Sequence, residues 1–491
     1  MRFRSTRRVL VALTVSGLVL GAAGCTAAER SDASRPTLAR AAASTVTVAD
    51  QAGAADRSVR TSRALFASAP GAVVADADDA DAVRDAASAA GRAHVPVLLA
   101  SGDGSAAAAE LDRLGASWYQ AEGDVSLDTD VASRQAPDAG DAPEPGRASR
   151  TATVVVADRT ADAWAVGTAK AAGARLVQMP AGVTDPAAAS GVVRALHEED
   201  GHPTVLVGAA FDALGDPDWT VRAAQGGWQL PHGGQRPFDG HRYVALYGAP
   251  GAPVLGVLGE QDPQATVERA ESVAASYRGL GDEPVTPAME VIATVAAGDA
   301  GDDGDYSREL PASTLEPYVD AAHDAGMPVV LDLQPGRSDF LSQAKRYESL
   351  LKKPGVWLAL DPEWRLTDDQ VPLEQIGSVS ADEVNEVSAW LADLVEREGL
   401  PPKALVLHQF RLSMIRDRSS LESHPQLDVL IHVDGQGSQP DKQATWKALH
   451  QDAPEGVHWG WKNFTDEDSP MLTPQQTMSD VSPTPSLITY Q

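Results

Sequence analysis

The sequence predicts an α/β protein with an N-terminal doubly wound parallel α/β repeat domain, followed by a TIM-like (β/α)8 barrel. Three observations predict this. Short apolar strands alternate with helical segments, a pattern typical of parallel sheets covered by helices. Two similar strand–helix–strand–helix–strand units lie within residues 61–235. Eight further strand candidates lie within 236–491, a segment close to the about 250 residues that such a barrel needs.

Residues 1–24 have the features of an export signal. Arginines at 2, 4, 7 and 8 precede the apolar run Val9–Val19, and Leu20-Gly-Ala-Ala-Gly-Cys25 follows. This resembles a bacterial lipoprotein signal, although Ala22 stands where that motif usually has Leu. The resemblance implies that Cys25 is lipidated and that the protein is anchored on the outer face of the cell membrane, through palmitate or similar acyl chains. An ordinary secretory signal is the alternative, and the export route, general or twin-arginine, stays open.

Residues 25–60 are rich in Ala, Ser, Thr and Asp and show no period, which predicts a flexible tether. The whole chain, rich in Ala, Gly and Asp and poor in Lys, is typical of actinobacterial proteins. Its net charge of −29 disfavours nucleic acid as a partner. We therefore expect an extracytoplasmic protein with no nucleic-acid partner.

The repeat predicted within 61–235 has six strands and four helices. Its strands are expected at Ala72–Asp76, Val95–Ala100, Ala116–Gln120, Thr153–Asp158, Arg175–Met179 and Thr204–Gly208. Its helices are expected at Ala80–Ala93, Ala106–Leu114, Ala161–Ala172 and Pro186–Glu199.

The stretch Ala72–Gly104 and the segment Val154–Gly173 resemble the second class of cell-wall-binding repeats of Gram-positive envelopes. The shared features are an apolar strand, an Asp- and Ala-rich helix and the strand Val95-Pro-Val-Leu-Leu. Two family features are missing: Glu122-Gly123 replaces a Gly-Gly, and the Arg-Tyr-Thr-Ala segment is absent. The resemblance implies cell-wall binding, while a generic doubly wound domain without wall affinity remains the alternative.

The strands expected for the barrel account for the second half of the chain. They are Arg242–Tyr247, Met289–Ala296, Met327–Leu333, Val356–Asp361, Ala404–Gln409, Val429–Val433, Val457–Trp461 and Leu487–Tyr490. Between them, Asp262 and Pro263 have the residue types of a helix N-cap and a first helical position.

Polar or aromatic residues end almost every barrel strand, where the active sites of such barrels lie. Asp361 and Glu363 share a strand parity, so both are expected to point one way, about 7 Å apart. An N-cap and an Arg partner are the alternative explanation for this pair. Glu290, at the start of its expected strand, is placed at the opposite end. The candidate catalytic residues are Glu363, Asp361, Asp332 and Asp434; the candidate substrate-binding residues are Tyr247, Gln334, Trp364, His408, Gln409, His432, Trp459, Trp461 and Asn463.

This mixture of residues is typical of sugar recognition, because aromatic rings stack on sugar faces and polar groups bond hydroxyls. The Asp361-x-Glu363 pair resembles the strand-four acidic motif of chitinase-like and lysozyme-like glycosidase barrels. It differs in having Ala359 where the chitinase motif has a further Asp. The resemblance implies glycoside hydrolysis with Glu363 as the acid, Asp361 raising its pKa by like charge, and Asp332 or Asp434 as the base.

A metal site from His408, His432, Asp434 and Asp332 is a weaker alternative, because no HxH or HExxH motif supports it. The acidic run Asp299–Asp305 lacks the spacing of a hand-type calcium loop. We therefore expect no metal and no cofactor. Two functions remain: an anchored lipoprotein that binds cell-wall or other polysaccharide, and a glycoside hydrolase acting on such a polysaccharide. A surface scaffold with an unknown partner is the third and least specific possibility.

Overall fold

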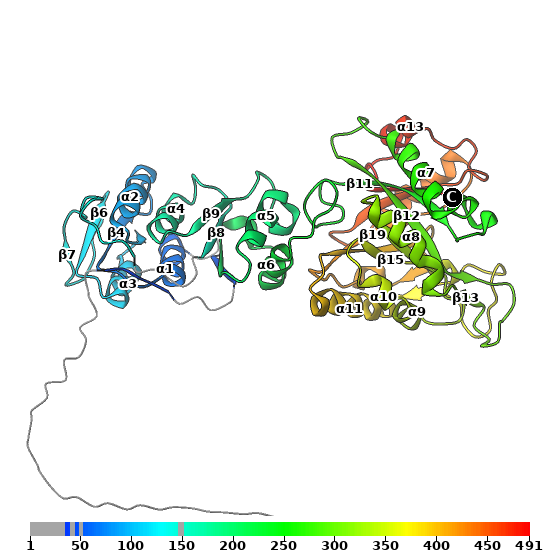
Figure 1. Ribbon diagram of the computed structural model, residues 1–491, viewed down its shortest axis with the longest axis horizontal. Coiled ribbons are helices and arrows are strands. Elements are labelled where there is room, and N and C mark those ends of the chain that lie inside the picture. Colours follow the sequence, from blue (N-terminus) through cyan, green and yellow to red (C-terminus); the bar gives the residue numbers. More distant parts are fainter. Residues whose placement is uncertain (1–34, 40–44, 49–52, 146–151) are drawn as a thin grey trace, which may run out of the picture.

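The computed structural model describes residues 35–39, 45–48, 53–145 and 152–491. These residues form an N-terminal α/β domain and a C-terminal barrel, which lie side by side along the long axis of the molecule (Figure 1). Both parts of the predicted fold class are confirmed. Cys25 and the signal segment lie outside the described residues.

The first repeat unit is a four-stranded parallel sheet in the order β5-β4-β6-β7. Its elements are β4 (Gly71–Asp76), α2 (Ala80–Ala93), β5 (Val97–Ala100), α3 (Ser105–Leu114), β6 (Trp118–Glu122) and β7 (Ala132–Ser133). Asp79 caps α2 by accepting hydrogen bonds from the backbone N–H groups of Asp81 and Ala82.

The second unit repeats this topology in a sheet of order β9-β8-β10-β2. Its elements are β8 (Thr153–Val156), α4 (Ala163–Ala171), β9 (Arg175–Gln178), α5 (Ser190–Glu198), β10 (Thr204–Val207) and α6 (Pro217–Gln225), with short 3-10 turns at Pro186–Ala188 and Ala209–Phe211. In both units the opening strand lies between the second and third strands, which confirms the internal repeat.

The two units pack through their equivalent helices α2 and α4. Gly167 on α4 permits this contact, because a Cβ at that position would lie 2.5 Å from the Cα of Ala87 on α2. The shared core between the units is built largely of Ala and Val side chains.

The prediction of a flexible tether at residues 25–60 is wrong for the part of this segment that the structure describes. That part contains β1 (Thr37–Leu38), β2 (Thr45–Val48) and most of α1 (Ala54–Leu65), and β3 (Phe66–Ser68) follows and pairs with β1. The strand β2 extends the second sheet beside β10. Sequence periodicity misses α1 because its buried face carries the polar residues Ser58, Thr61 and Ser62 in place of an apolar stripe. These hydroxyls are bonded: Ser62 donates to Glu110 at 2.7 Å.

The domains are joined by residues 226–241, and the predicted boundary at 235/236 falls inside this segment. Leu230 and Phe238 pack together with Tyr243 and Trp357 at the N-terminal ends of the barrel strands. Arg236, close behind, forms ion pairs with Asp185 of the N-terminal domain at 2.7 Å and with Asp428 of the barrel at 3.1 Å. The joining segment therefore closes the bottom of the barrel.

The barrel is formed by eight parallel strands, and the pairing of the first strand with the last and with the second closes the ring. The strands are β11 (Arg242–Gly248), β12 (Val285–Ala296), β14 (Val329–Leu333), β15 (Val356–Leu360), β17 (Lys403–Gln409), β19 (Leu427–Val433), β20 (His458–Asn463) and β21 (Leu487–Tyr490). All eight overlap the predicted ranges, and the largest difference is the start of β12, four residues earlier than expected.

Helices follow the strands and cover the outside of the ring (Figure 1). They are α7 (Pro263–Ala275), α8 (Ala312–Asp324), α9 (Phe340–Arg346), α10 (Glu348–Leu351), α11 (Ala381–Glu398), α12 (Gln439–Leu449) and α13 (Pro474–Asp480). The predicted N-cap of α7 is confirmed, since Asp262 accepts a hydrogen bond from the N–H of Ala265 at 2.9 Å. Among the described residues, no helix has the length and apolar character needed to cross a bilayer.

Candidate active site

The C-terminal ends of the barrel strands surround a cavity of about 690 Å³. Because the segment 226–241 closes the opposite end, the cavity lies at the open end of the barrel. It is lined by acids, cations and aromatic rings; those used below are Tyr247, Gln334, Asp361, Glu363, Trp364, Arg411, Asp434 and Lys462.

The inward-facing positions of the strands change from apolar to ionisable along the barrel axis. The lower layers include Ala245, Ala288, Val330, Ala359 and Val406. The next inward position, two residues further along each strand or, for Asp361, just beyond its end, carries the polar set Tyr247, Glu290, Asp332, Asp361, His408, His432, Lys462 and Thr489. A charged layer therefore lies on an apolar floor.

His408 lies between two carboxylates in this layer. Its Nδ1 is 2.9 Å from Asp434 Oδ2, and its Nε2 is 2.7 Å from Glu290 Oε1. Burial alone would lower the pKa of His408, but the charge of Glu290 and its other acidic neighbours outweighs burial and holds this pKa well above its usual value. His408 is therefore an imidazolium bound to both acids.

Glu290 was expected at the wrong end of its strand, and that expectation is wrong. Because β12 begins at Val285, Glu290 lies in mid-strand, opposite Tyr247 of β11 and Val330 of β14. Burial raises the pKa of Glu290, but the neighbouring His408 outweighs it and the pKa is lowered. An inward-parity acid in an otherwise apolar strand was the signal that could have identified it.

Asp361 and Glu363 both line the cavity, as expected, but they do not lie on one strand. The strand β15 ends at Leu360, and Pro362–Trp364 forms a 3-10 turn. Burial, followed by the charge of Glu363, raises the pKa of Asp361 well above its usual value. Burial also raises the pKa of Glu363 to about 7, and Asp434 is the next contributor, rather than Asp361.

Asp434 and Asp332 differ in their ionisation. Burial raises the pKa of Asp434, but its hydrogen bond with His408 outweighs burial, so the pKa is lowered and the group is ionised. Burial raises the pKa of Asp332 to about 6, against the opposing charge of His408. Asp434 is therefore the better placed of the two as a base, and one of its carboxylate oxygens lies within 4.8 Å of one on Asp361.

Tyr247 and Lys462 complete one side of the cavity. The hydroxyl of Tyr247 donates to Asp332 Oδ2 at 2.8 Å and accepts from Gln334 Nε2 at 3.2 Å. The ammonium of Lys462 lies 3.5 Å from the centre of the Tyr247 ring. Sequence reasoning missed Lys462, because it selected the neighbouring tryptophans of the same strand.

The side chains of four candidate substrate-binding residues point away from the barrel interior, so the prediction that they line the site is wrong. Gln409 bonds Arg411 O and Arg418 on the outer face. Trp459 and Trp461 pack against Trp446 of α12, and Trp461 Nε1 donates to Asn463 Oδ1. Their parity explains this: Gly460 and Lys462 are the inward positions of β20, and a Cβ at Gly460 would meet His432 at 2.6 Å.

His432 and Trp364 do lie at the site. The Nε2 of His432 is 3.1 Å from the hydroxyl of Thr489, and burial lowers the pKa of His432 to about 3, so the ring is neutral. The indole N–H of Trp364 is buried at the cavity wall and has no hydrogen-bond acceptor within the described structure.

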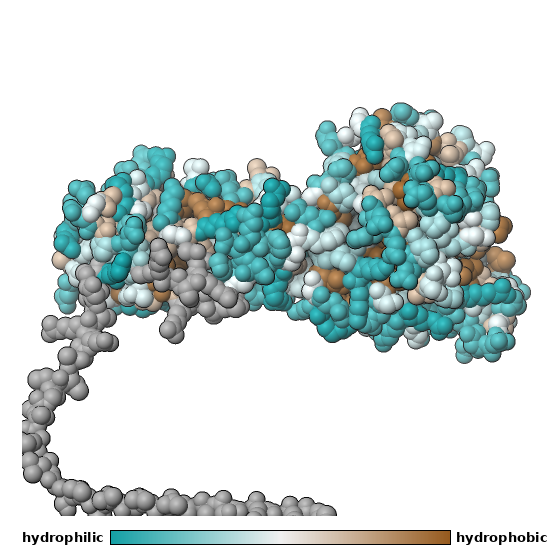
Figure 2. Space-filling view, in the orientation of Figure 1, coloured by the Kyte–Doolittle hydropathy of each residue, from teal (hydrophilic) through white to brown (hydrophobic). Residues whose placement is uncertain are grey.

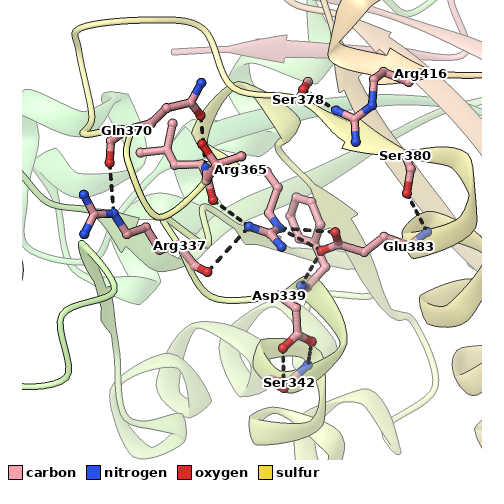
Figure 3. Close-up of polar contacts among 12 residues, drawn as sticks. Arg337, Asp339, Ser342, Arg365, Gln370, Ser378, Ser380, Glu383 and Arg416 are labelled. Atoms are coloured by element: carbon pink, nitrogen blue, oxygen red, sulfur yellow. Dashed lines mark hydrogen bonds and ion pairs between the residues drawn. The ribbon is translucent and has the colours of Figure 1, made fainter.

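The loop that carries Glu363 and Trp364 is fastened to helix α11 (Figure 3). Arg365 donates to Glu383 at 2.9 Å and to its neighbour Leu366 O at 2.7 Å, and Arg337 donates to Gln370 O at 2.9 Å. The N–H of Gly377 closes the loop on Glu363 O at 2.7 Å. These contacts fix the backbone that positions the Glu363 carboxyl.

Two groups of buried side chains have metal-binding atom types within 4.8 Å of one another: Glu290, His408 and His432, and Asp361, His408 and Asp434. Both groups depend on His408, whose two ring nitrogens already contact carboxylates. A metal ion would have to break one of these contacts, so the arrangement fits a buried ion-pair network better than a metal centre.

Comparisons with known proteins give little further identification. No family model and no curated protein matches this sequence. The solved structure of Cwp6 from Clostridium difficile matches with 12% sequence identity and a TM-score of 0.29, over 59% of this chain and 63% of that one. The match thus spans less than two thirds of that protein. A likeness this distant assigns neither a family nor a function to the chain.

Proposed function

We propose that the barrel is a glycoside hydrolase, with Glu363 as the general acid and Asp434 as the base or nucleophile. One observation carries this proposal: two carboxyl groups of a single cavity have pKa values shifted in opposite directions. Such a pair can supply one protonated and one ionised carboxyl at the same pH, which glycoside hydrolysis requires.

The acids of the cavity form no ion pairs with Arg242, Arg365 or Arg411, the arginines that would have given these acids a purely structural role. Arg242 pairs with Glu283 at 3.1 Å near the bottom of the barrel, and Arg365 pairs with Glu383. Arg411 lines the cavity and makes no ion pair among the described residues. His408 is hydrogen-bonded to Asp434, and the charges of His408 and Lys462 lower the pKa values of Asp434 and Glu363.

The cavity wall also favours a saccharide as ligand. Trp364, Phe410 and Phe464 present aromatic surface, and Gln334 and Gln436 provide polar groups for hydroxyls. A cavity of about 690 Å³ has room for a short saccharide.

The reaction assigns each proton to a residue. Glu363 donates its proton to the glycosidic oxygen as the bond from that oxygen to the anomeric carbon breaks. If Asp434 is the base, the oxygen of a water molecule bonds to that carbon and Asp434 receives the water proton. If Asp434 is the nucleophile, its oxygen bonds to that carbon first; water then displaces Asp434, and the ionised Glu363 receives the water proton. Before the reaction, His408 holds Asp434 ionised and in place.

The cellular setting is also a proposal. The signal-like sequence and Cys25 support a lipid-anchored protein on the outer face of the membrane. The repeat-like units support binding of cell-wall glycan, which would bring the barrel to an envelope polysaccharide. Binding without cleavage is the second candidate function, and Ala359, which replaces a carboxylate of the resembled motif, favours it.

Incubation of the purified mature protein with peptidoglycan, arabinogalactan and chitin fragments tests both candidates. We expect mass spectrometry to detect released saccharide. The rate of release should fall by about 10²–10⁴-fold in Glu363→Gln and in Asp434→Asn, while both variants still bind the fragments. Glu374→Gln, an exposed acid of the same loop that does not line the cavity, is the matched control. Binding without product would favour the second candidate, and full activity of Glu363→Gln would refute the assignment.

A further inference from the structure

The exposed large hydrophobic side chains of the described chain gather at one end of the barrel. All of them lie on loops that follow the C-terminal ends of strands: Val254 (89% exposed), Leu373 (85%), Ile376 (39%), Leu412 (51%) and Met471 (36%). We call these five residues the apolar rim. Isolated exposed hydrophobic residues are normal on a protein surface, but their restriction to one end marks a contact surface.

The apolar rim is continuous with the active-site cavity. Leu373 and Ile376 line the cavity itself, together with Leu255, which adjoins Val254 in the chain. Figure 2 shows hydrophobic residues on the end of the barrel away from the N-terminal domain. A ligand whose polar part reaches Glu363 would therefore meet aliphatic side chains where it leaves the cavity.

The loop that carries Leu373 and Ile376 is held in this exposed position. Its two ends are tied by the bonds from Gly377 N to Glu363 O and from Ser378 N to Arg365 O. Arg365 is in turn paired with Glu383 of α11 (Figure 3). The aliphatic groups are thus presented to solvent by a fixed backbone rather than by a free chain.

We propose that the substrate is an amphiphilic saccharide, with its sugar in the cavity and a hydrocarbon chain against the apolar rim. This rests on the proposed function, and it adds the substrate class. A chain on the substrate fits better than an anionic membrane surface, because the protein has a net charge of −29 and such a surface would repel it.

Calorimetric titration of the full mature protein with hexyl, octyl and decyl β-glucoside, each below its critical micelle concentration, tests the inference. Full burial of a methylene changes affinity by about 4-fold, so an open rim should tighten binding by about 2- to 4-fold per added methylene. The Leu373→Ser/Ile376→Ser variant should lose this dependence, and Glu374→Ser, in the same loop, should keep it. Thermal unfolding should be unchanged in both variants, because the altered side chains are exposed.

The outcomes separate the apolar rim from the hydrolase. If the wild type cleaves saccharides but binds the glucosides equally or not at all, the rim proposal is overturned and the hydrolase stands. If chain length matters and the double variant abolishes its effect, but no saccharide is cleaved, the rim stands and the hydrolase fails. Glu363→Gln should keep the chain-length effect. Rim-dependent binding to phosphatidylcholine vesicles, or rim-dependent dimers in light scattering, would replace the proposed occupant by a membrane or a second copy.

Discussion

The imidazole of His408 lies 2.9 Å from the carboxylate of Asp434 and contacts Glu290 through its other ring nitrogen at 2.7 Å. All three groups are fully or almost fully buried. One cation therefore pairs with two acids, from β12 and from the end of β19, across the barrel interior. This relationship keeps Asp434 ionised beside a Glu363 that keeps its proton, so His408 is a positioning residue for the proposed base.

Replacing His408 by Gln should therefore damage both stability and activity. The change leaves Glu290 and Asp434 buried without their cation, and breaking a buried ion pair costs about 3–5 kcal/mol. Urea denaturation should show this loss, and the acidic limb of the activity profile should move to higher pH because the pKa of Asp434 rises.

His432→Gln is the matched control, because His432 is equally buried in the same layer but neutral. Its replacement removes a ring and no charge, so the acidic limb should stay in place. A shift of equal size in both variants would show that packing, not the charge of His408, sets the pKa of Asp434.

The pH dependence of cleavage should follow Glu363. Burial and the charge of Asp434 raise the pKa of Glu363 to about 7, and only the protonated form can donate. Activity should be retained below this pH and fall about tenfold per pH unit above it. Lys462 opposes the upward shift, so Lys462→Met should move the falling limb to higher pH in a profile of kcat/KM measured from pH 4 to 9. A limb that stays fixed or moves to lower pH would contradict this assignment.

The stability of the barrel should depend on the joining segment. Phe238 is buried, and its ring centre lies 6.0 Å from the rings of both Tyr243 and Trp357 at the bottom of the barrel. Phe238→Ala should lower the free energy of unfolding by about 3–5 kcal/mol, as expected for a buried aromatic side chain. Chemical denaturation measures this; a loss below about 1 kcal/mol would mean that the segment does not belong to the barrel core.

The barrel could be predicted from sequence because its strands are nearly continuous apolar runs, which parallel sheets buried on both faces require. The position of the cavity could be predicted from the rule that the active sites of such barrels lie at the C-terminal ends of the strands. The N-terminal elements β2 and α1 were not predicted, since β2 gains its partners only from β10, far along the chain. Such a strand has no local signal beyond four β-prone residues, TVTV.

Strand parity decides which of the predicted site residues face the barrel interior. Asp361 and Asp434 line the cavity, and Asp332 and His408 are buried among the inward-facing side chains. On β20 the large side chains of the tryptophans were predicted to face the site, but they face outward. The inward-facing position is the small Gly460. Parity fixed by the smallest residue of a strand, rather than by the largest, would have selected Lys462.

Lys403 provides a prediction that does not depend on the cavity. This first residue of β17 is fully buried, donates to Val356 O at 2.7 Å and to Lys353 O at 3.1 Å, and has no carboxylate partner in the described structure. Burial lowers the pKa of Lys403 to about 7, whereas the unfolded chain titrates near 10.5. Between these values the unfolded chain binds more protons, so stability should rise with pH, by up to about 1.4 kcal/mol per pH unit. Lys403→Met should remove this rise from denaturation midpoints measured between pH 7 and 10, and a variant whose profile still matched the wild type would show that the ammonium stays charged in the folded protein.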